Sequence, residues 1–231
     1  MNNSTNTANS SLTVSTWRQI ILPYEIACDF ANPFLDVSIK ATFTGPDGQN
    51  IVREAYWDGG RTYKVAFAPT APGTWHWCIE APEETGLNGI TGQLCCTPYS
   101  GHLAIYRHGF LKTDSTGTHL TYQDGTPFFW LGDTHWAFAY GERWEQSNHP
   151  QMQSMFRGMA DRRVEQGFTV YQTNLRADFT ADGTPSPYWA KGQEGILPNV
   201  EFYQKELDRR MYYLADCGLV NALGFAWFMS I

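Results

Sequence analysis

The first hundred residues contain short runs of alternating apolar and polar side chains, separated by turn sequences. The run from Leu35 to Phe43 alternates in this way, and Gly45 to Gly48 then turns the chain. Similar strand-forming runs cover residues 61–67, 74–80 and 92–97. Short strands at this spacing predict an immunoglobulin-like β-sandwich over residues 13–100. The polar Asn, Ser and Thr residues of segment 1–12 predict a disordered tail before it.

The pattern changes after residue 100. Residues 110–112 and 119–122 predict a hairpin within a connecting segment that we assign to residues 101–127. The continuous apolar run from Phe128 to Leu131 predicts a strand that is buried on both faces. Such a strand is typical of a parallel sheet covered by helices.

Helical and strand patterns alternate in the rest of the chain. After Pro150, and until Gly167, apolar residues recur at helical spacing, namely Met152, Met155, Phe156 and Met159. A strand is predicted at 168–173. Asn199 then predicts the start of a second helix, which ends at Gly218 and has an apolar face of Leu207, Met211, Leu214 and Ala215. A third strand is predicted from residue 219.

This order of strand, helix, strand, helix and strand predicts parallel strands with right-handed crossovers. A closed barrel and an open sheet both begin in this way. A dinucleotide-binding sheet needs a GxGxxG turn after its first strand, and the sequence LGDTHW at 131–136 lacks it. We therefore predict a multidomain chain, β then α/β, in which residues 128–231 form the first three βα units of an incomplete (β/α)8, or TIM, barrel.

Composition narrows the classes of partner. Hydrophobic residues make up 42% of the chain and charged residues 17%, so the apolar surface suffices for packed cores. The formal charge is -7 and the basic residues are scattered, so we expect no nucleic-acid partner. Aromatic residues make up 15%, which suits either well-filled cores or flat surfaces for a ligand. A neutral or small polar partner fits this balance.

Location and cofactors are judged from three further features. No apolar stretch reaches the roughly 18 residues that a membrane span needs, so we expect no membrane partner. The N-terminus lacks a basic start and an apolar core, which predicts a cytoplasmic protein, or a secreted one if the true N-terminus is missing. The five Cys residues lack CxxC spacing, so we expect reduced thiols, no metal and no cofactor. Secretion would allow a bridge from Cys78 to Cys95 or Cys96.

Polar and aromatic residues follow each predicted strand. In a βα barrel the functional groups lie at the C-terminal ends of the strands. This rule predicts a substrate-binding rim of Asp133, Trp136, Gln172, Asn174 and Trp227. Carboxylate and amide groups bind sugar hydroxyls, and indole rings pack against the apolar faces of a sugar ring. The rim therefore predicts a carbohydrate partner.

Each candidate also has a structural interpretation. Asp133 would alternatively brace a loop, and both Trp136 and Trp227 would pack in a core. His135 has no second His at metal-ligand spacing, so we interpret it as structural. The long loop over residues 175–198 is consistent with a binding role or with a plain connection. Glycoside hydrolysis usually needs two carboxylates, and Asp133 is the one placed at a strand end, so no catalytic residue is assigned.

Several motifs resemble those of one known family. The sequence DGTPFFWLGDTHW at 124–136 resembles the opening motif of the apiosidase-like glycoside hydrolase domain. The sequence RRVEQGFTVYQ at 162–172 is similar to the segment that follows in that family, and so are residues 198–203 and 216–219. Upstream, FTGPDG at 43–48 and FAPTAPGTW at 67–75 resemble the β-sandwich domain that commonly precedes such barrels.

The resemblance implies a glycosidase barrel, of the retaining or a related type, that acts on plant or complex glycans, including branched pectin side chains. Thr169 stands where the family usually has Asn. The family's catalytic acid and nucleophile come from later strands, and no residue here matches them. The segment from Thr118 to Ile231 is under half of the roughly 250 residues of a whole barrel. We therefore expect a truncated barrel that is inactive as a fragment.

Two functions follow from these observations. The first is the N-terminal portion of a glycoside hydrolase. The alternative is a non-catalytic carbohydrate-binding or scaffold module in which the β-sandwich carries the function. The exposure of Trp57, Trp75 and Trp77 distinguishes the two, because an exposed aromatic row would favour binding by the sandwich. We expect at least Trp75 or Trp77 to be buried.

Overall fold

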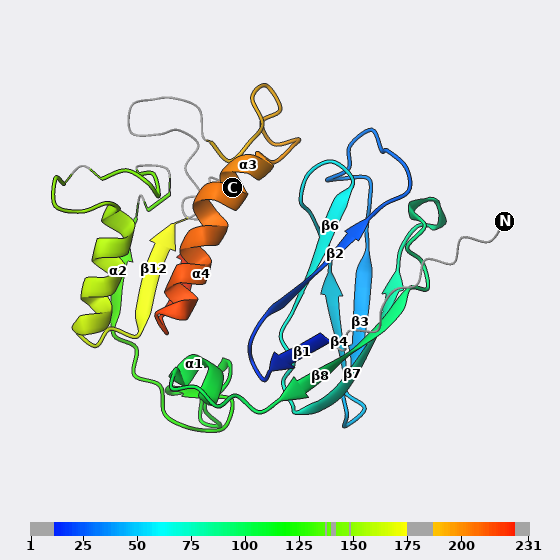
Figure 1. The fold of residues 1–231 in the computed structure, drawn as a ribbon. Helices are drawn as coiled ribbons and strands as arrows, with labels where there is room; N and C mark the ends of the chain where they lie inside the picture. Colours follow the sequence, from blue (N-terminus) through cyan, green and yellow to red (C-terminus); the bar gives the residue numbers. More distant parts are fainter. Residues whose placement is uncertain (1–11, 137, 140–141, 148, 175–186, 225–231) are drawn as a thin grey trace. The chain divides into compact units, whose positions relative to one another are not determined.

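The computed structural model describes residues 12–136, 138–139, 142–147, 149–174 and 187–224. The chain divides into two compact units, Met1–Gly101 and His102–Ile231 (Figure 1). Among the described residues, more lie in β-strands than in helices.

The first unit contains two β-sheets. The larger has the order β1 (Leu12–Ser15), β8 (Thr91–Thr97), β7 (Gly73–Glu80), β3 (Lys40–Thr44) and β4 (Asn50–Glu54). The smaller has the order β2 (Ile20–Glu25), β6 (Thr62–Phe67) and β5 (Tyr56–Trp57). All pairs are antiparallel except β1 with β8. A short 3₁₀ helix, η1 (Glu83–Thr85), lies between β7 and β8.

One apolar core joins the two sheets. Alternate residues of β6 and β7 are buried, as the period of two in a strand requires. Phe43 of the larger sheet stacks on Phe67 of the smaller one, with ring centroids 3.7 Å apart. Trp75 is fully buried beside them, and its indole N–H donates to the Ala71 carbonyl oxygen at 2.9 Å. The two sheets therefore form a sandwich around shared aromatic side chains.

The tryptophans of this unit do not form an exposed row. Trp75 is fully buried, which confirms the expectation that Trp75 or Trp77 lies in the core. Trp57 and Trp77 are partly buried and pack against the same core. The Trp57 indole N–H donates to the Gly60 carbonyl oxygen at 2.9 Å. These contacts do not favour the alternative in which the sandwich binds sugars through an aromatic face.

Two boundaries predicted for this unit were wrong. Leu12, assigned to the tail, begins strand β1, whereas residues 1–11 lie outside the described residues. The strand predicted from Leu35 begins only at Lys40, because the Asn32 side chain accepts hydrogen bonds from the Phe34 and Leu35 amides and turns the chain. Leu35 is 62% exposed.

The five cysteines are free thiols, so the bridge considered for Cys78 does not form.

The second unit begins with helix α1 (Ala104–Arg107) and the predicted hairpin, now seen as β9 (Leu111–Thr113) antiparallel to β10 (Leu120–Tyr122). A three-stranded sheet follows, in the order β11 (Gly132–His135), β12 (Val170–Asn174) and β13 (Val220–Gly224). Both of its strand pairs are parallel, which confirms the parallel strands predicted from the sequence.

Helices connect these parallel strands. Helix α2 (Met155–Glu165) joins β11 to β12. A continuous helical segment precedes β13 and consists of α3 (Val200–Phe202), the π-helical turn η2 (Tyr203–Asp208) and α4 (Arg209–Asp216). Figure 1 shows α2 and α4 beside β12. Asn199 caps this segment by accepting a hydrogen bond from the Phe202 amide, which confirms the predicted start.

The first parallel strand was predicted too early in the chain. The apolar run 128–131 is not a strand, because β11 starts at Gly132. Phe129 is 74% exposed, and Phe128 packs against Tyr122 of the hairpin. Helix α2 likewise starts at Met155 rather than near Pro150, because the Ser154 side chain accepts a hydrogen bond from the Arg157 amide and caps the helix.

The parallel sheet separates two apolar clusters. On one face, Tyr171 packs with residues of α2 and α4, among them Phe156 and Leu214. On the other face, Val170, Val220 and Ala222 pack against side chains of α1 and the hairpin. Residues of β12 therefore alternate between a helix face and a hairpin face.

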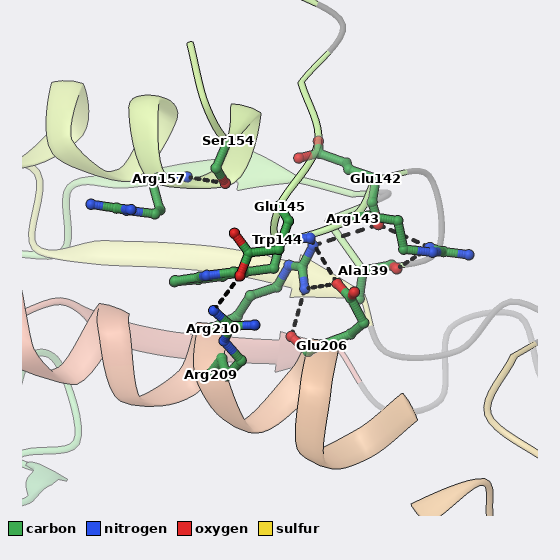
Figure 2. A network of polar contacts seen from close by, with 10 residues as sticks. All are labelled: Ala139, Glu142, Arg143, Trp144, Glu145, Ser154, Arg157, Glu206, Arg209 and Arg210. Atoms are coloured by element: carbon green, nitrogen blue, oxygen red, sulfur yellow. Dashed lines mark hydrogen bonds and ion pairs between the residues drawn. The ribbon is translucent and has the colours of Figure 1, made fainter. Parts of the chain in front are cut away.

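A buried ion pair fixes the loop between β11 and α2. Arg210 of α4 is completely buried and donates to the Glu206 carboxylate at 2.6 Å (Figure 2). The same carboxylate oxygen accepts the Trp144 amide of the loop at 2.9 Å. Three guanidinium groups lie 4.9 to 5.9 Å from the Trp144 ring, those of Arg157, Arg209 and Arg210. The loop is thus held on the helix of the next βα unit.

We predict that Phe67→Ala destabilises the first unit by about 3–5 kcal/mol, because the substitution leaves a cavity beside Phe43. Urea denaturation of the purified protein measures the change in the free energy of unfolding. Val52→Ala serves as the control, since Val52 is 52% exposed, and it should change stability much less. Equal effects of the two substitutions would contradict the shared core.

We predict that Glu206→Ala destabilises the second unit by about 3–5 kcal/mol, because it leaves the buried Arg210 guanidinium without its carboxylate. Glu201→Ala is a matched control, since Glu201 and Lys205 form an exposed ion pair at the same i,i+4 spacing. The control should change stability far less. Similar unfolding midpoints in urea for both variants would argue against a structural role of the buried pair.

Candidate functional site

Two of the candidate residues share the hairpin face of the parallel sheet. Gln172 and Asn174 follow Val170 at intervals of two, so all three side chains point to that face. Val170 is fully buried under the hairpin, Gln172 is partly exposed, and Asn174 is 4% exposed. In the neighbouring strand β13, Ala222 and Gly224 pair with Gln172 and Asn174. This face is therefore apolar where the strands begin and carries amides toward their C-terminal ends.

Asp133 lies on the opposite, helix face. Because β11 begins at Gly132, Asp133 lies within the strand rather than after it. Its carboxylate forms an ion pair with Arg163 near the C-terminal end of α2. The Arg163 guanidinium also lies 5.2 Å from the Phe168 ring centroid and donates to the Gln166 side chain. This position corresponds to the bracing role that was the alternative for Asp133, and it separates Asp133 from Gln172 and Asn174.

His135 joins three elements on the helix face. Its Nε2 contacts the Glu142 carboxylate of the following loop, and its Nδ1 lies 2.8 Å from the Tyr171 hydroxyl of β12. Its ring also stacks against Phe156 of α2. Burial, and secondarily the carboxylates of Glu142 and Asp133, raises the pKa of Tyr171, so this hydroxyl stays neutral. His135 is therefore part of a buried hydrogen-bonded chain.

The structure describes one of the two tryptophan candidates, Trp136, and one end of the long loop. Trp136 directly follows β11 and is partly buried. Trp227 and residues 175–186 of the long loop lie outside the described residues. In the described end of that loop, Tyr188 is 5% exposed and packs edge-on against Phe202 of α3. Trp189 pairs with Pro198 in an isolated β-bridge. The described end of the loop thus packs on the helix start.

Thr169 joins the segments that lead into the first two parallel strands. Its hydroxyl donates to the Phe129 carbonyl oxygen at 2.6 Å and accepts from the Leu131 amide at 3.1 Å. The Thr169 amide donates to the Leu131 carbonyl oxygen at 3.0 Å. The residue that departs from the family's usual Asn therefore still supplies a side-chain donor and an acceptor before β12.

Two important residues, Glu142 and Arg210, were missed in the sequence analysis. Glu142 lies in an irregular loop, where no periodicity assigns its side chain to a face. Arg210 occupies a helix position between Met211 and Arg209, and a charged residue is ordinarily expected at the surface. Only its i,i+4 spacing from Glu206 hinted at a partner.

In the described part of the chain, neither a metal-binding cluster nor a membrane-spanning helix is found. No group of three or more His, Cys, Asp or Glu side chains there has the arrangement of a metal site. No helix in those ranges has both the length and the hydropathy of a membrane span.

The chain is similar to two families of domains and to solved structures. Residues 13–82 match the profile described as a domain of unknown function (DUF5060), and residues 114–231 match the profile described as Apiosidase-like, catalytic domain. No curated protein matches the sequence. The crystal structure of a candidate glycoside hydrolase from Bacteroides vulgatus superposes with a TM-score of 0.71 at 21% identity, over 93% of this chain and 41% of that chain.

A second solved structure, described as a glycoside hydrolase, is 26% identical over 50% of this chain and 25% of its own. Its TM-score of 0.31 is too low to support an argument about the fold. The chain thus spans less than half the length of either structure. The likeness at 21% identity supports a glycoside hydrolase-like fold and no more. The family follows from the profile match, which covers half of the chain and includes the three parallel strands. The chain belongs to the apiosidase-like family of glycoside hydrolases.

Proposed function

We propose that the second unit forms the sugar-binding edge of a glycoside hydrolase that acts on plant or complex glycans. The observation that carries the proposal is the division of the hairpin face, which is apolar at Val170 and carries amides at Gln172 and Asn174. Amide side chains both donate and accept hydrogen bonds, as sugar hydroxyls require. Family membership supports a carbohydrate substrate.

In this proposal the three parallel strands are the first staves of a (β/α)8 barrel, and their hairpin face is the barrel interior. The hairpin then closes the N-terminal end, as the bottom of such a barrel requires. The support is the parallel register of β11, β12 and β13 together with the packing of the connecting helices α2 and α4 on one face. The first unit is proposed as an immunoglobulin-like accessory sandwich, on the basis of its two sheets around one core.

The residue roles follow from these faces. Gln172 is proposed to bind sugar hydroxyls directly, and the buried Asn174 to shape the end of the strand. Trp136 and Trp227 are proposed as aromatic walls of the same site. Asp133 is proposed as a brace between β11 and α2, because its carboxylate already pairs with Arg163.

Bond cleavage requires more than these strands contain. Glycoside hydrolysis usually uses two carboxylates on either side of the scissile bond. The strands β11, β12 and β13 include one carboxylate, Asp133, and it faces the helices. We therefore propose that the three described strands bind the sugar and that the catalytic acid and nucleophile are not among their residues.

We predict that the 231-residue chain binds oligosaccharides prepared from pectin, and that Gln172→Ala weakens this binding about tenfold, because a hydrogen-bonding amide is lost from the site. Isothermal titration calorimetry measures the affinity. Asp133→Asn is the control, and it should leave the affinity within about twofold of the wild type. A weaker affinity for Asp133→Asn than for Gln172→Ala would reverse the assignment of these two residues.

We predict no turnover by the 231-residue chain alone, because its described parallel strands do not supply a pair of catalytic carboxylates. Release of reducing sugar from pectin and other plant polysaccharides is the measurement, with a commercial pectinase mixture as the positive control. Robust activity that Asp133→Asn abolishes would show that this carboxylate is catalytic after all.

A further inference from the structure

The pair His135 and Glu142 closes a loop of seven residues after the first parallel strand. His135 is the last residue of β11, and the Glu142 carboxylate returns to its Nε2. Trp136 lies directly after His135, inside this loop. The loop also includes Phe138 and Ala139, which are fully buried in the cluster on the helix face. The pair therefore joins the residue just before Trp136 to residue 142, farther along the same loop.

The far side of the loop is fixed independently. Arg143 donates to the carbonyl oxygens of Ala139 and Glu142 at 3.1 and 2.9 Å (Figure 2). The Trp144 amide is bound by Glu206, and the Arg210 guanidinium reaches the Glu142 carbonyl oxygen at 3.5 Å. These contacts hold the backbone at the described residues 139 and 142–144. On the strand side, the His135 backbone pairs with Thr173 of β12, and its side chain contacts Glu142 and Tyr171.

The burial of the Glu142 carboxylate is energetically unfavourable. It is 15% exposed, and its second oxygen, Oε2, is buried without a hydrogen-bond partner among the described residues. A buried carboxylate oxygen that lacks a partner destabilises the fold. Groups that lower stability in this way are concentrated at functional sites. A brace that served stability alone would be better made from apolar residues.

We propose that Glu142 is a positioning residue of the sugar site: acting through His135, it fixes the strand side of the loop and thereby holds Trp136 at the C-terminal end of β11. The inference rests on the proposed function, since it concerns the same site and the same ligand. Glu142 itself does not touch the sugar. Its effect on the ligand is indirect. The hydrogen bond orients His135, and the backbone that follows His135 carries Trp136.

The test measures the affinity of the 231-residue chain for pectic oligosaccharides by calorimetry. Glu142→Ala should weaken binding at least tenfold, whereas Glu142→Gln should stay within about threefold, because the amide group still hydrogen-bonds to the His135 Nε2. Glu145→Gln is the control from the same segment, since Glu145 is exposed and pairs with Arg209, and it should bind as the wild type does. Amide hydrogen exchange of residues 135–144 should rise in Glu142→Ala and not in Glu142→Gln.

If Glu142→Ala does not fold, His135→Phe combined with Glu142→Leu replaces it. This double variant keeps the ring stacked on Phe156 and buries no charge, so the fold survives while the directional bond is lost. It should also bind at least tenfold more weakly than the wild type. A folded Glu142→Ala or double variant with wild-type affinity would overturn the positioning role and leave the proposed function intact. A wild-type chain that binds no pectic oligosaccharide would overturn the proposed function, and the positioning role with it.

Discussion

The architecture of the second unit depends on one buried cation. A guanidinium group removed from water needs acceptors, and the Arg210 Nη1 donates to both the carboxylate and the carbonyl oxygen of Glu206, whereas its buried Nε has no hydrogen-bond partner among the described residues. Burial lowers the pKa of Arg210, and the Glu206 carboxylate opposes this effect. Because the same carboxylate binds the Trp144 amide, the electrostatic requirement of one helix fixes the loop that leaves the first strand. The position of the candidate site is therefore coupled to a helix that comes more than sixty residues later.

The two faces of the parallel sheet carry different kinds of side chain. The helix face holds ionic and hydrogen-bonded groups that join elements, including the pairs Asp133 with Arg163 and His135 with Glu142. The hairpin face holds apolar residues at the strand starts and amides farther along. In the function proposed above, this polar end of the hairpin face binds the sugar, because a carbohydrate ligand needs hydrogen-bonding groups.

Sequence patterns predicted the elements that are governed by local chemistry. The cap at Asn199, the helix end at Gly218 and the parallel order of the strands were all accessible from spacing and residue type. The start of β11 was not, because the apolar run 128–131 resembles a buried strand, although Phe129 is exposed and Phe128 packs on the hairpin. Because of that error of four residues, Asp133 was assigned to the rim, whereas it lies within β11 on the helix face. Glu142 was missed because a loop contact between residues seven apart leaves no periodic pattern.

The hydrogen bonds of Thr169 contribute to the register of β11 on β12, and this register sets which side chains each face of the sheet carries. Side chains alternate along a strand, so sliding β11 by a single position against β12 would transfer every one of its side chains to the other side. His135 would then lie on the side of the amides, and its contact with Tyr171 would be broken. The hydroxyl of Thr169 holds the backbone at both Phe129 and Leu131, and with the strand pairing it favours the observed alignment. A small side chain outside any strand thus helps to separate the face that assembles the protein from the face proposed to bind a ligand.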